Sequence, residues 1–374
     1  MSDHFTTVTH TSWGQKLMNS FVGALIGILL FFGSFFVLWM NEGKIDWSKV
    51  ASSSVAVDAG SAGTSSDGKF IAAQGVIHSD ETLGDAKYLS AGSYLQLNRV
   101  VEMYAWKEES RSETKKNLGG GETTTTTYDY VKEWTDSPED SSSFEYQSNH
   151  TNPKKAVDNA AMTVKQAKVG QLSLDTAQLE MPEASNLPLT SDMVEEGSSH
   201  RFIEPYIFIG KGTPDAPQIG DLRISYTAVD NDVKATVFGT QQGMAVAPYS
   251  YKGESFYRAI AGDRTQAIAV LKTEHDILTW VLRLAGFLMM WFGIMLAFGP
   301  ITSFLDVLPL LGNIGGFMIG VVSFGIAFVL SAITIIIAII VHNIILQIIL
   351  LLLVLGGLVA WVKIRNRNVV AAQA

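Results

Sequence analysis

The chain of 374 residues contains no cysteine. Disulfides, thiolate metal sites, iron–sulfur clusters and cysteine nucleophiles are therefore excluded. A phosphate-binding loop is also missing, because the three glycines at 119–121 are not followed by Lys and Ser or Thr. No set of nucleophile, base and orienting group can be named. We therefore predict no catalytic residue and no cofactor, and we expect the protein not to be an enzyme.

Histidine is scarce and scattered. The seven histidines stand at positions 4, 10, 78, 150, 200, 275 and 342, and none has the HExxH or a similar metal-binding spacing. We therefore predict no metal ligand. We interpret His342, at a turn between two apolar runs, as an interfacial residue rather than an intramembrane functional group.

Charge is low at 17% of residues, and the net charge is −9. The acidic excess lies mostly within 41–276. Binding of nucleic acid needs faces rich in Lys and Arg, so we predict no nucleic-acid partner.

Four long apolar runs are nearly free of charge, at 19–40, 277–298, 314–341 and 344–362. Each is close to or beyond the roughly 20 residues that a helix needs to cross a bilayer core. They lack the alternation of strands, which indicates helices. We predict an α+β membrane protein with four transmembrane helices and a large β-rich domain between the first and the second.

Basic residues predict the sidedness of these helices. Lys363, Arg365 and Arg367 follow the last run, which places the tail 363–374 in the cytoplasm under the positive-inside rule. Four crossings put the tail 1–18 and the interfacial loop 299–313 on that side as well. Residues 41–276, with a Ser- and Gly-rich linker at 51–68, then lie outside the cytoplasm. We expect a bacterial inner membrane with a periplasmic domain, or the endoplasmic reticulum or inner nuclear membrane in a eukaryote.

Within the large domain, the composition predicts a hairpin of strands at 94–108 and 123–134. Further strands are expected at 202–209, 221–229 and 233–239, a short helix at 156–167, and a helix at 263–276 that continues into the second span. Core packing is favoured for four hairpin aromatics, although they could instead line a pocket: Tyr104, Trp106, Tyr128 and Trp134. Glu102 and Arg223 lie in apolar strands, where they could pair or be exposed by alternation.

Glycines recur on two of the apolar runs. Gly312, Gly316 and Gly320 are spaced by four and make a flat helix face, and Gly23 and Gly27 form a similar pair on the first run. Such faces let a second helix approach closely. Packing within the chain and contact between subunits explain the α-helical row at 312–320 equally well. We read the pair on the first run as ordinary membrane-helix composition.

Several motifs in one order resemble the LUMA family (transmembrane protein 43). They cover nearly the whole chain and comprise Asn41-Glu42-Gly43-Lys44, Val101-Glu102-Met103-Tyr104-Ala105-Trp106, Glu133-Trp134, Asn152-Pro153, Gly220-Asp221-Leu222-Arg223, and Thr279-Trp280 with Arg283 and Gly286. The Val-Glu-Met-Tyr-x-Trp element is the most specific of these.

The resemblance implies four spans, a large lumenal domain between the first two, and self-association. Animal members lie in the endoplasmic reticulum and inner nuclear membrane and are tied to nuclear-envelope organisation. The resemblance implies no catalytic residues for this sequence. This sequence departs at His342-Asn343, where animal proteins have an Arg-Pro turn. Its acidity and Ser-rich linker are bacterial in character, so nuclear-envelope partners such as lamins are not carried over.

Our leading hypothesis is a non-enzymatic membrane scaffold that self-associates and presents an extracytoplasmic interaction domain. Its expected partners are membrane lipids, further copies of itself and other membrane proteins. The alternative is a ligand- or lipid-binding sensor, or a lipid-handling protein, with a pocket between the outer domain and the bilayer. An extracytoplasmic hydrolase ranks third.

Overall fold

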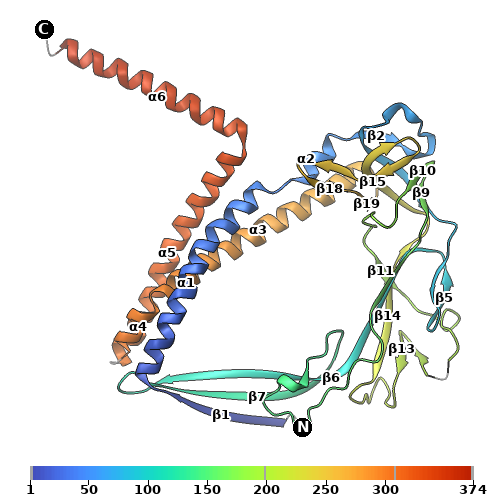
Figure 1. The fold of residues 1–374 in the computed structure, drawn as a ribbon, viewed down its shortest axis with the longest axis horizontal. Coiled ribbons are helices and arrows are strands. Elements are labelled where there is room, and N and C mark those ends of the chain that lie inside the picture. The colour runs from blue at the N-terminus through green and yellow to red at the C-terminus, as the bar shows by residue number, and fades with distance from the viewer. Residues whose placement is uncertain (1–2, 198, 307–308, 372–374) are drawn as a thin grey trace. The chain divides into compact units, whose positions relative to one another are not determined.

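The computed structural model describes the chain except residues 1–2, 198, 307–308 and 372–374, and describes side chains except at 309–315, 360 and 362–371. The chain divides into two units (Figure 1). The first comprises 1–7, 47–112 and 125–273, and the second comprises 8–46, 113–124 and 274–374.

The first unit is built mainly from two sheets. One has the strand order β1-β7-β6-β14-β13-β12, with β8 paired to β6 and β11 to β14. Its strands are β1 (Asp3–Thr11), β6 (Tyr94–Lys116), β7 (Glu122–Thr135), β8 (Ala160–Thr163), β11 (Ser185–Leu187), β12 (Arg201–Ile203), β13 (Tyr206–Ile209) and β14 (Leu222–Asp230). The ends of β1, β6 and β7 at 8–11, 113–116 and 122–124 belong to the second unit.

The other sheet has the order β19-β15-β16-β10-β9-β3-β2. Its strands are β2 (Val55–Asp58), β3 (Phe70–His78), β9 (Ala167–Val169), β10 (Leu172–Leu174), β15 (Val233–Gln242), β16 (Ala245–Ala247) and β19 (Arg258–Ala261). Two small pairs accompany it, β4 (Leu83–Asp85) with β5 (Leu89–Gly92), and β17 (Tyr249–Tyr251) with β18 (Glu254–Phe256). Short helices are α2 (Trp47–Ser52), η1 (Ala59–Ser61), η2 (Thr64–Ser66) and η3 (Ser141–Ser143).

Buried and partly exposed side chains alternate along the long strand β6, so one face of the strand packs into the core. Leu95, Leu97, Val101 and Met103 are fully buried, whereas the residues between them are partly exposed. β14 pairs with β6 in antiparallel register, so that Arg223 lies opposite Glu102. The predicted hairpin and the strands expected at 221–229 and 233–239 are confirmed, although β6 runs on to Lys116 because paired Ser and Thr side chains continue the ladder, as Thr114 and Thr124 do at 3.0 Å. The single strand expected at 202–209 is wrong, because the chain turns at Glu204-Pro205 and β12 pairs with β13 in antiparallel register.

Two further predictions for the first unit were wrong. The helix expected at 156–167 is replaced by β8, because the edge of β6 offers backbone partners from Gln96 to Arg99, and by the start of β9, which pairs with β10 and β3 in the other sheet. The linker expected at 51–68 contains the end of α2 and all of β2, η1 and η2, and β2 pairs in parallel with β3. Small side chains such as Ala51 and Ala59 are fully buried there, so the low hydrophobicity that suggested a linker reflects close packing.

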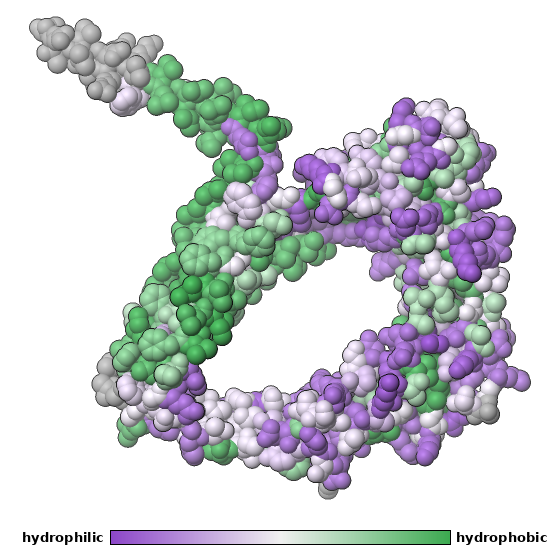
Figure 2. All heavy atoms as spheres, in the orientation of Figure 1, coloured by the Kyte–Doolittle hydropathy of each residue, from purple (hydrophilic) through white to green (hydrophobic). Residues whose placement is uncertain are grey.

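The second unit consists mainly of helices: α1 (Trp13–Gly43), the part of α3 (Arg264–Ala297) from residue 274 onwards, α4 (Gly299–Leu305), α5 (Pro309–His342) and α6 (Ile344–Ala371). Hydrophobic residues cover these helices (Figure 2). Three of them are long and apolar enough to cross a membrane, within Trp13–Ser52, Arg264–Ala297 and Gly316–His342, and Ile344–Val359 is a shorter apolar helix. The α+β class is thus confirmed, whereas a fourth span stays a prediction.

The helix bounds refine the expected ones. α1 begins six residues before the predicted start of the first span, with Ser12 as its N-cap. The predicted continuity of the helix at 263–276 with the second apolar run is confirmed by α3. The expected loop 299–313 contains α4, which has Pro300 in its first turn, and the beginning of α5.

Candidate functional site

Close packing of α1 against α3 is centred on two glycines. A Cβ added to Gly27 would lie 2.6 Å from the carbonyl oxygen of Gly293, and one on Gly293 would lie 2.7 Å from the amide of Phe31. Gly23 is less critical, because a Cβ there would meet only Leu296, at 3.9 Å. Of the predicted pair, Gly27 therefore has a specific packing role within the chain.

A polar cluster lies at the C-terminal end of α1. The Arg283 guanidinium donates to both carboxylate oxygens of Glu42, at 2.8 and 2.9 Å, and lies 5.0 Å from the centre of the Trp280 ring. The Asn41 amide donates to the Thr279 carbonyl at 3.1 Å, and the Lys44 ammonium donates to the Asn41 side-chain oxygen at 2.7 Å. The structure thus brings together motif residues that are over 230 positions apart in the chain.

Gly43, another motif residue, lies beneath the His342 ring. A Cβ on Gly43 would lie 2.6 Å from His342 Nε2, so a larger residue would displace the imidazole. His342 Nδ1 bonds the Ala338 carbonyl at 2.8 Å, and the ring meets Trp39 edge-on with centroids 5.0 Å apart. The interfacial role predicted for His342 stays consistent with its place at the end of α5.

A second polar cluster lies at the N-terminal end of α1. Lys16 bonds both Glu122 and Asp306, and Lys116 donates to the other oxygen of Asp306 at 2.6 Å. Asp306 is almost fully buried. Burial acts to raise the pKa of its carboxyl, but the ammonium groups of Lys116 and Lys16 outweigh this and hold the pKa below its usual value. This ion cluster anchors the hairpin tip, which comprises residues 116–122 between β6 and β7.

The indole of Trp13 completes this anchor. It donates to the Ser303 carbonyl at 2.9 Å and packs against Phe304 and against Gly120 of the hairpin tip. Gly120 has a φ of +84° and leaves no space for a side chain beside Trp13. Sequence reasoning missed this site, because Lys16, Lys116 and Asp306 are single charges at the margins of apolar or polar stretches.

The anchor bears on the sidedness of the membrane. The sequence scheme placed 1–18 and 299–313 across the bilayer from 41–276, but residues 116–122 contact Trp13, Lys16 and Asp306. A charged hairpin tip does not traverse hydrocarbon, so an intact bilayer between these segments would break the anchor.

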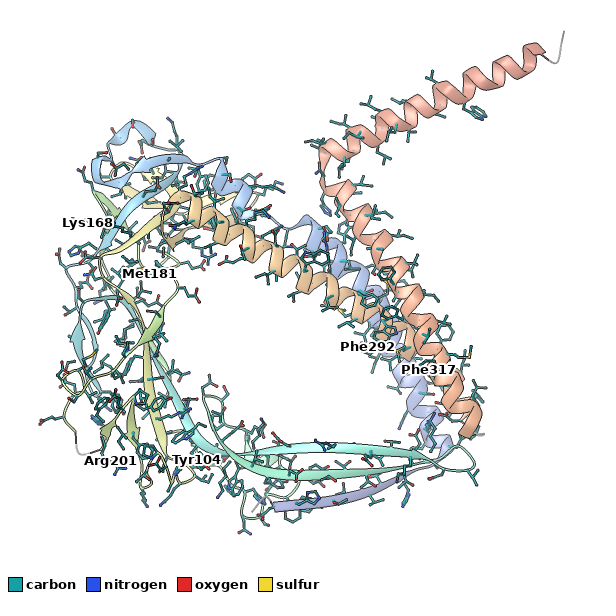
Figure 3. The ribbon with its side chains drawn as sticks, turned by 180° about the vertical axis from the view of Figure 1, so that it is seen from behind. Tyr104, Lys168, Met181, Arg201, Phe292 and Phe317 are labelled. Atoms are coloured by element: carbon teal, nitrogen blue, oxygen red, sulfur yellow. The ribbon has the colours of Figure 1, made fainter. Side chains whose placement is uncertain are left out.

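A third cluster lies on the partly exposed face of β6, β7 and β14. Arg223 pairs with Glu102 at 2.6 Å, and its guanidinium lies 4.8 Å from the Trp134 ring centre and 4.7 Å from that of Tyr206. Tyr104, labelled in Figure 3, packs against Trp134 with centroids 5.3 Å apart. Both charged side chains are about a quarter exposed, so the pair forms at the surface rather than in the core.

The other two hairpin aromatics belong to a separate group. Trp106 meets the His150 ring at 4.8 Å, with the Lys132 ammonium 4.4 Å from its own ring centre, and Tyr128 packs edge-on against Tyr146. The four aromatics therefore do not converge on one pocket. Packing is their observed role.

The remaining motif residues shape the fold. Val101 and Met103 are core side chains, and Gly220 adopts a φ of +92° next to Pro153. The buried Asp221 accepts hydrogen bonds from the backbone amides of Lys211, Gly212 and Gln218, between 2.7 and 3.1 Å, which closes the turn before β14. Within the residues that the structure describes, no group of three or more His, Asp or Glu side chains could hold a metal ion.

The glycine row on α5 differs from the glycines of α1 and α3. Among the described atoms, a Cβ on Gly316 or Gly320 would meet nothing within 4 Å. The Trp291 indole donates to the Gly320 carbonyl at 3.0 Å, which places α3 near the helix but leaves the glycine Cα face open. Gly312 lies in α5, and its surroundings fall outside the described side chains.

Comparison with known proteins assigns the family. The family model for transmembrane protein 43 matches residues 103–344. Transmembrane protein 43 of Homo sapiens is 25% identical over 350 residues, covering 86% of this chain and 84% of that protein. The Drosophila melanogaster homologue is 27% identical over 302 residues, covering 76% and 78%. No solved structure matches the chain significantly. The family match spans well over half of the sequence and includes all three side-chain clusters in part, and the chain therefore belongs to the transmembrane protein 43 family.

Proposed function

We propose that the protein is a non-enzymatic membrane scaffold that self-associates through the glycine face of α5. The observation that carries this proposal is the contrast between two sets of glycines. Gly27 and Gly293 pack closely against each other's helix within the chain, whereas a Cβ added to Gly316 or Gly320 would meet no described atom within 4 Å. An open small-residue face inside an apolar helix favours a second helix as its neighbour.

The neighbouring surface supports the same proposal. Phe317, labelled in Figure 3, is 73% exposed on α5, and Val321 is 55% exposed, so bulky apolar side chains flank the glycines. Glycines with adjacent large side chains give a surface of hollows and knobs that can pack against a copy of itself. The symmetric pairing of α5 with α5 is the simplest arrangement of this kind.

The β-rich unit would then present the interaction surface of the scaffold. Its candidate face is the cluster of Glu102, Tyr104, Trp134 and Arg223, because aromatic and arginine side chains dominate binding energy at protein interfaces. The rigid ladder of β6 and β14 beneath it holds these side chains in fixed positions. Other membrane proteins are the partners that we propose for this face.

The test of self-association is the mass of the full chain extracted into nanodiscs. We expect a defined homo-oligomer for the wild type and dissociation in Gly316→Leu and in Gly320→Leu. Gly325→Leu is the matched control, because Gly325 is equally open on the same helix but lies outside the four-residue row. A monomer in every case would refute self-association, and an oligomer that resists both substitutions would move the contact away from this face.

A further inference from the structure

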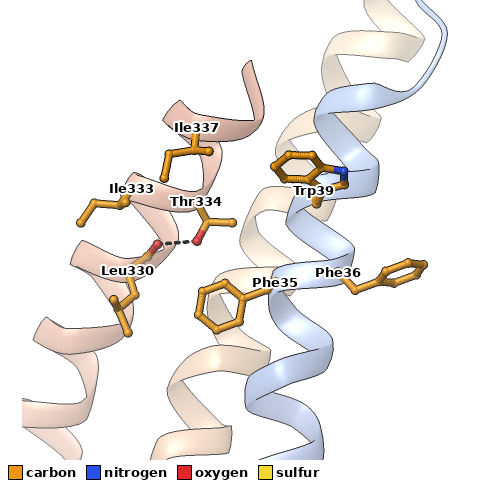
Figure 4. Close-up of a pocket in the computed structure, with 7 residues that line it drawn as sticks. All are labelled: Phe35, Phe36, Trp39, Leu330, Ile333, Thr334 and Ile337. Atoms are coloured by element: carbon orange, nitrogen blue, oxygen red, sulfur yellow. Dashed lines mark hydrogen bonds between the residues drawn. The ribbon is translucent and has the colours of Figure 1, made fainter. Parts of the chain in front are cut away.

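An apolar pocket lies between α1 and α5 in the second unit (Figure 4). Its volume is about 460 Å³. α1 supplies one wall with aromatic side chains and α5 supplies the other with branched aliphatic ones; the lining residues are Phe35, Phe36, Trp39, Leu330, Ile333, Thr334 and Ile337. The hydroxyl of Thr334 donates to the Leu330 carbonyl at 2.7 Å, so its donor is already used within α5.

The two polar ends of the helices fix the depth of this pocket. Trp39 is three residues, or about 4.5 Å along the helix axis, from Glu42 and its ion pair with Arg283. The ring of His342 closes this end against Trp39 and Gly43. Leu330 lies seven residues before Ile337, roughly 10 Å further along α5. The pocket therefore starts beneath a polar boundary and extends into the apolar part of two candidate spans.

The walls favour hydrocarbon over another helix. Contacts between membrane helices are enriched in small residues, whereas six of the seven lining side chains of this pocket are large and apolar and only Thr334 is small. Phe36 is 66% exposed and Ile333 is 47% exposed, so the lining is open to its surroundings. At this depth the surroundings are acyl chains, and water has no hydrogen-bonding partner to hold it there.

We propose that this pocket binds one acyl chain of a membrane phospholipid. The head group stays at the polar boundary beside Trp39 and His342, and the chain runs between α1 and α5 past Phe35 and Thr334 (Figure 4). The aromatic wall and the branched aliphatic wall contact opposite sides of the chain through dispersion forces. Lipid binding here differs from the alternative considered from the sequence, because its site lies between helices and uses none of the hairpin aromatics.

The test uses the full chain in nanodiscs of phosphatidylcholine that contains a small fraction of phosphatidylcholine with a photoactivatable diazirine on one acyl chain. We expect labelling to concentrate in the peptides that contain residues 35–39 and 330–337. Ile333→Trp fills the pocket and should reduce this labelling at least about fourfold, the effect of losing one buried methylene. Ile348→Trp is the matched control, because it adds the same bulk at an exposed isoleucine of α6 that belongs neither to the pocket lining nor to the glycine face of α5.

Two results would overturn the proposal. Labelling spread evenly along α5, with no response to Ile333→Trp, would mean that the pocket holds no particular lipid. A protein–protein crosslink at residues 330–337 would assign the pocket to a second copy. The mass of each variant in the nanodisc shows whether it has folded and assembled, and a monomeric chain that still labels at the pocket would separate this proposal from the scaffold.

Discussion

The carboxylate of Glu42 receives two hydrogen bonds from the guanidinium of Arg283, 241 residues later in the chain. The Glu42 side chain is only 7% exposed and that of Arg283 is 21% exposed. The bidentate geometry fixes the register of α1 against α3, since it ties the C-terminal end of α1 to the middle of α3.

Removing one partner leaves the other charge poorly solvated. We expect Arg283→Ala to lower the free energy of unfolding by roughly 3 kcal/mol, near the lower end for breaking a buried ion pair. Glu42→Ala should have a similar effect, and the double variant should lose far less than the sum. Thermal unfolding in nanodiscs of all four proteins gives the coupling energy, and strict additivity would show that the pair contributes nothing as a pair.

Packing of α1 on α3 predicts a sharp difference between two glycines. Gly27→Ala forces a methyl group into the backbone of α3 at Gly293, whereas Gly33→Ala places its methyl 3.5 Å from the flexible end of Met289. We expect Gly27→Ala to cost roughly 1–3 kcal/mol, the range for overpacking, and Gly33→Ala to be near neutral. Equal unfolding temperatures for the two variants would contradict the close approach.

The ion cluster at Asp306 predicts a dependence on pH. Because the pKa of this carboxyl is lowered in the folded chain, its contribution is complete above the unfolded value of about 3.8 and is lost as the pH falls through the folded pKa. At pH 7, Asp306→Asn should cost roughly 2 kcal/mol, the strength of a hydrogen bond to a charged group.

Thermal unfolding at pH 7 and near pH 3 measures this effect. The difference between wild type and Asp306→Asn should shrink at the lower pH. Glu113→Gln, which removes an exposed carboxyl of the same hairpin region, should have little effect at either pH. A difference that is the same at both values would show that the charge of Asp306 is not what holds the hairpin tip.

The contact of the N-terminal strand with the hairpin predicts a crosslink. His10 Nδ1 lies 2.9 Å from the Thr123 hydroxyl, and the chain has no native cysteine to interfere. His10→Cys combined with Thr123→Cys should form a disulfide in native membranes without detergent. Failure of this pair, with a disulfide appearing only after solubilisation, would restore the scheme in which residues 1–18 and 41–276 lie on opposite sides of the bilayer.

Local patterns in the sequence were sufficient for the β6 strand and for α3, because alternation and continuous apolarity are properties of neighbouring residues. They failed at 156–167, where the available edge of β6 outweighed helix propensity. For Glu102 and Arg223 the sequence left two alternatives open, an ion pair or separate exposure to solvent. The pairing of Lys16 with Asp306 was not predictable, since it joins charges 290 residues apart through no local signal.

Self-association through α5 is tested most directly by single cysteines placed along that helix in native membranes. We expect rapid disulfide-linked dimers at Gly316→Cys and Gly320→Cys, and little at Met318→Cys, which is exposed but lies about half a turn around the helix from both. That periodic pattern would place two copies of α5 face to face. Equal crosslinking at all three positions, or none at any of them, would contradict the proposed scaffold.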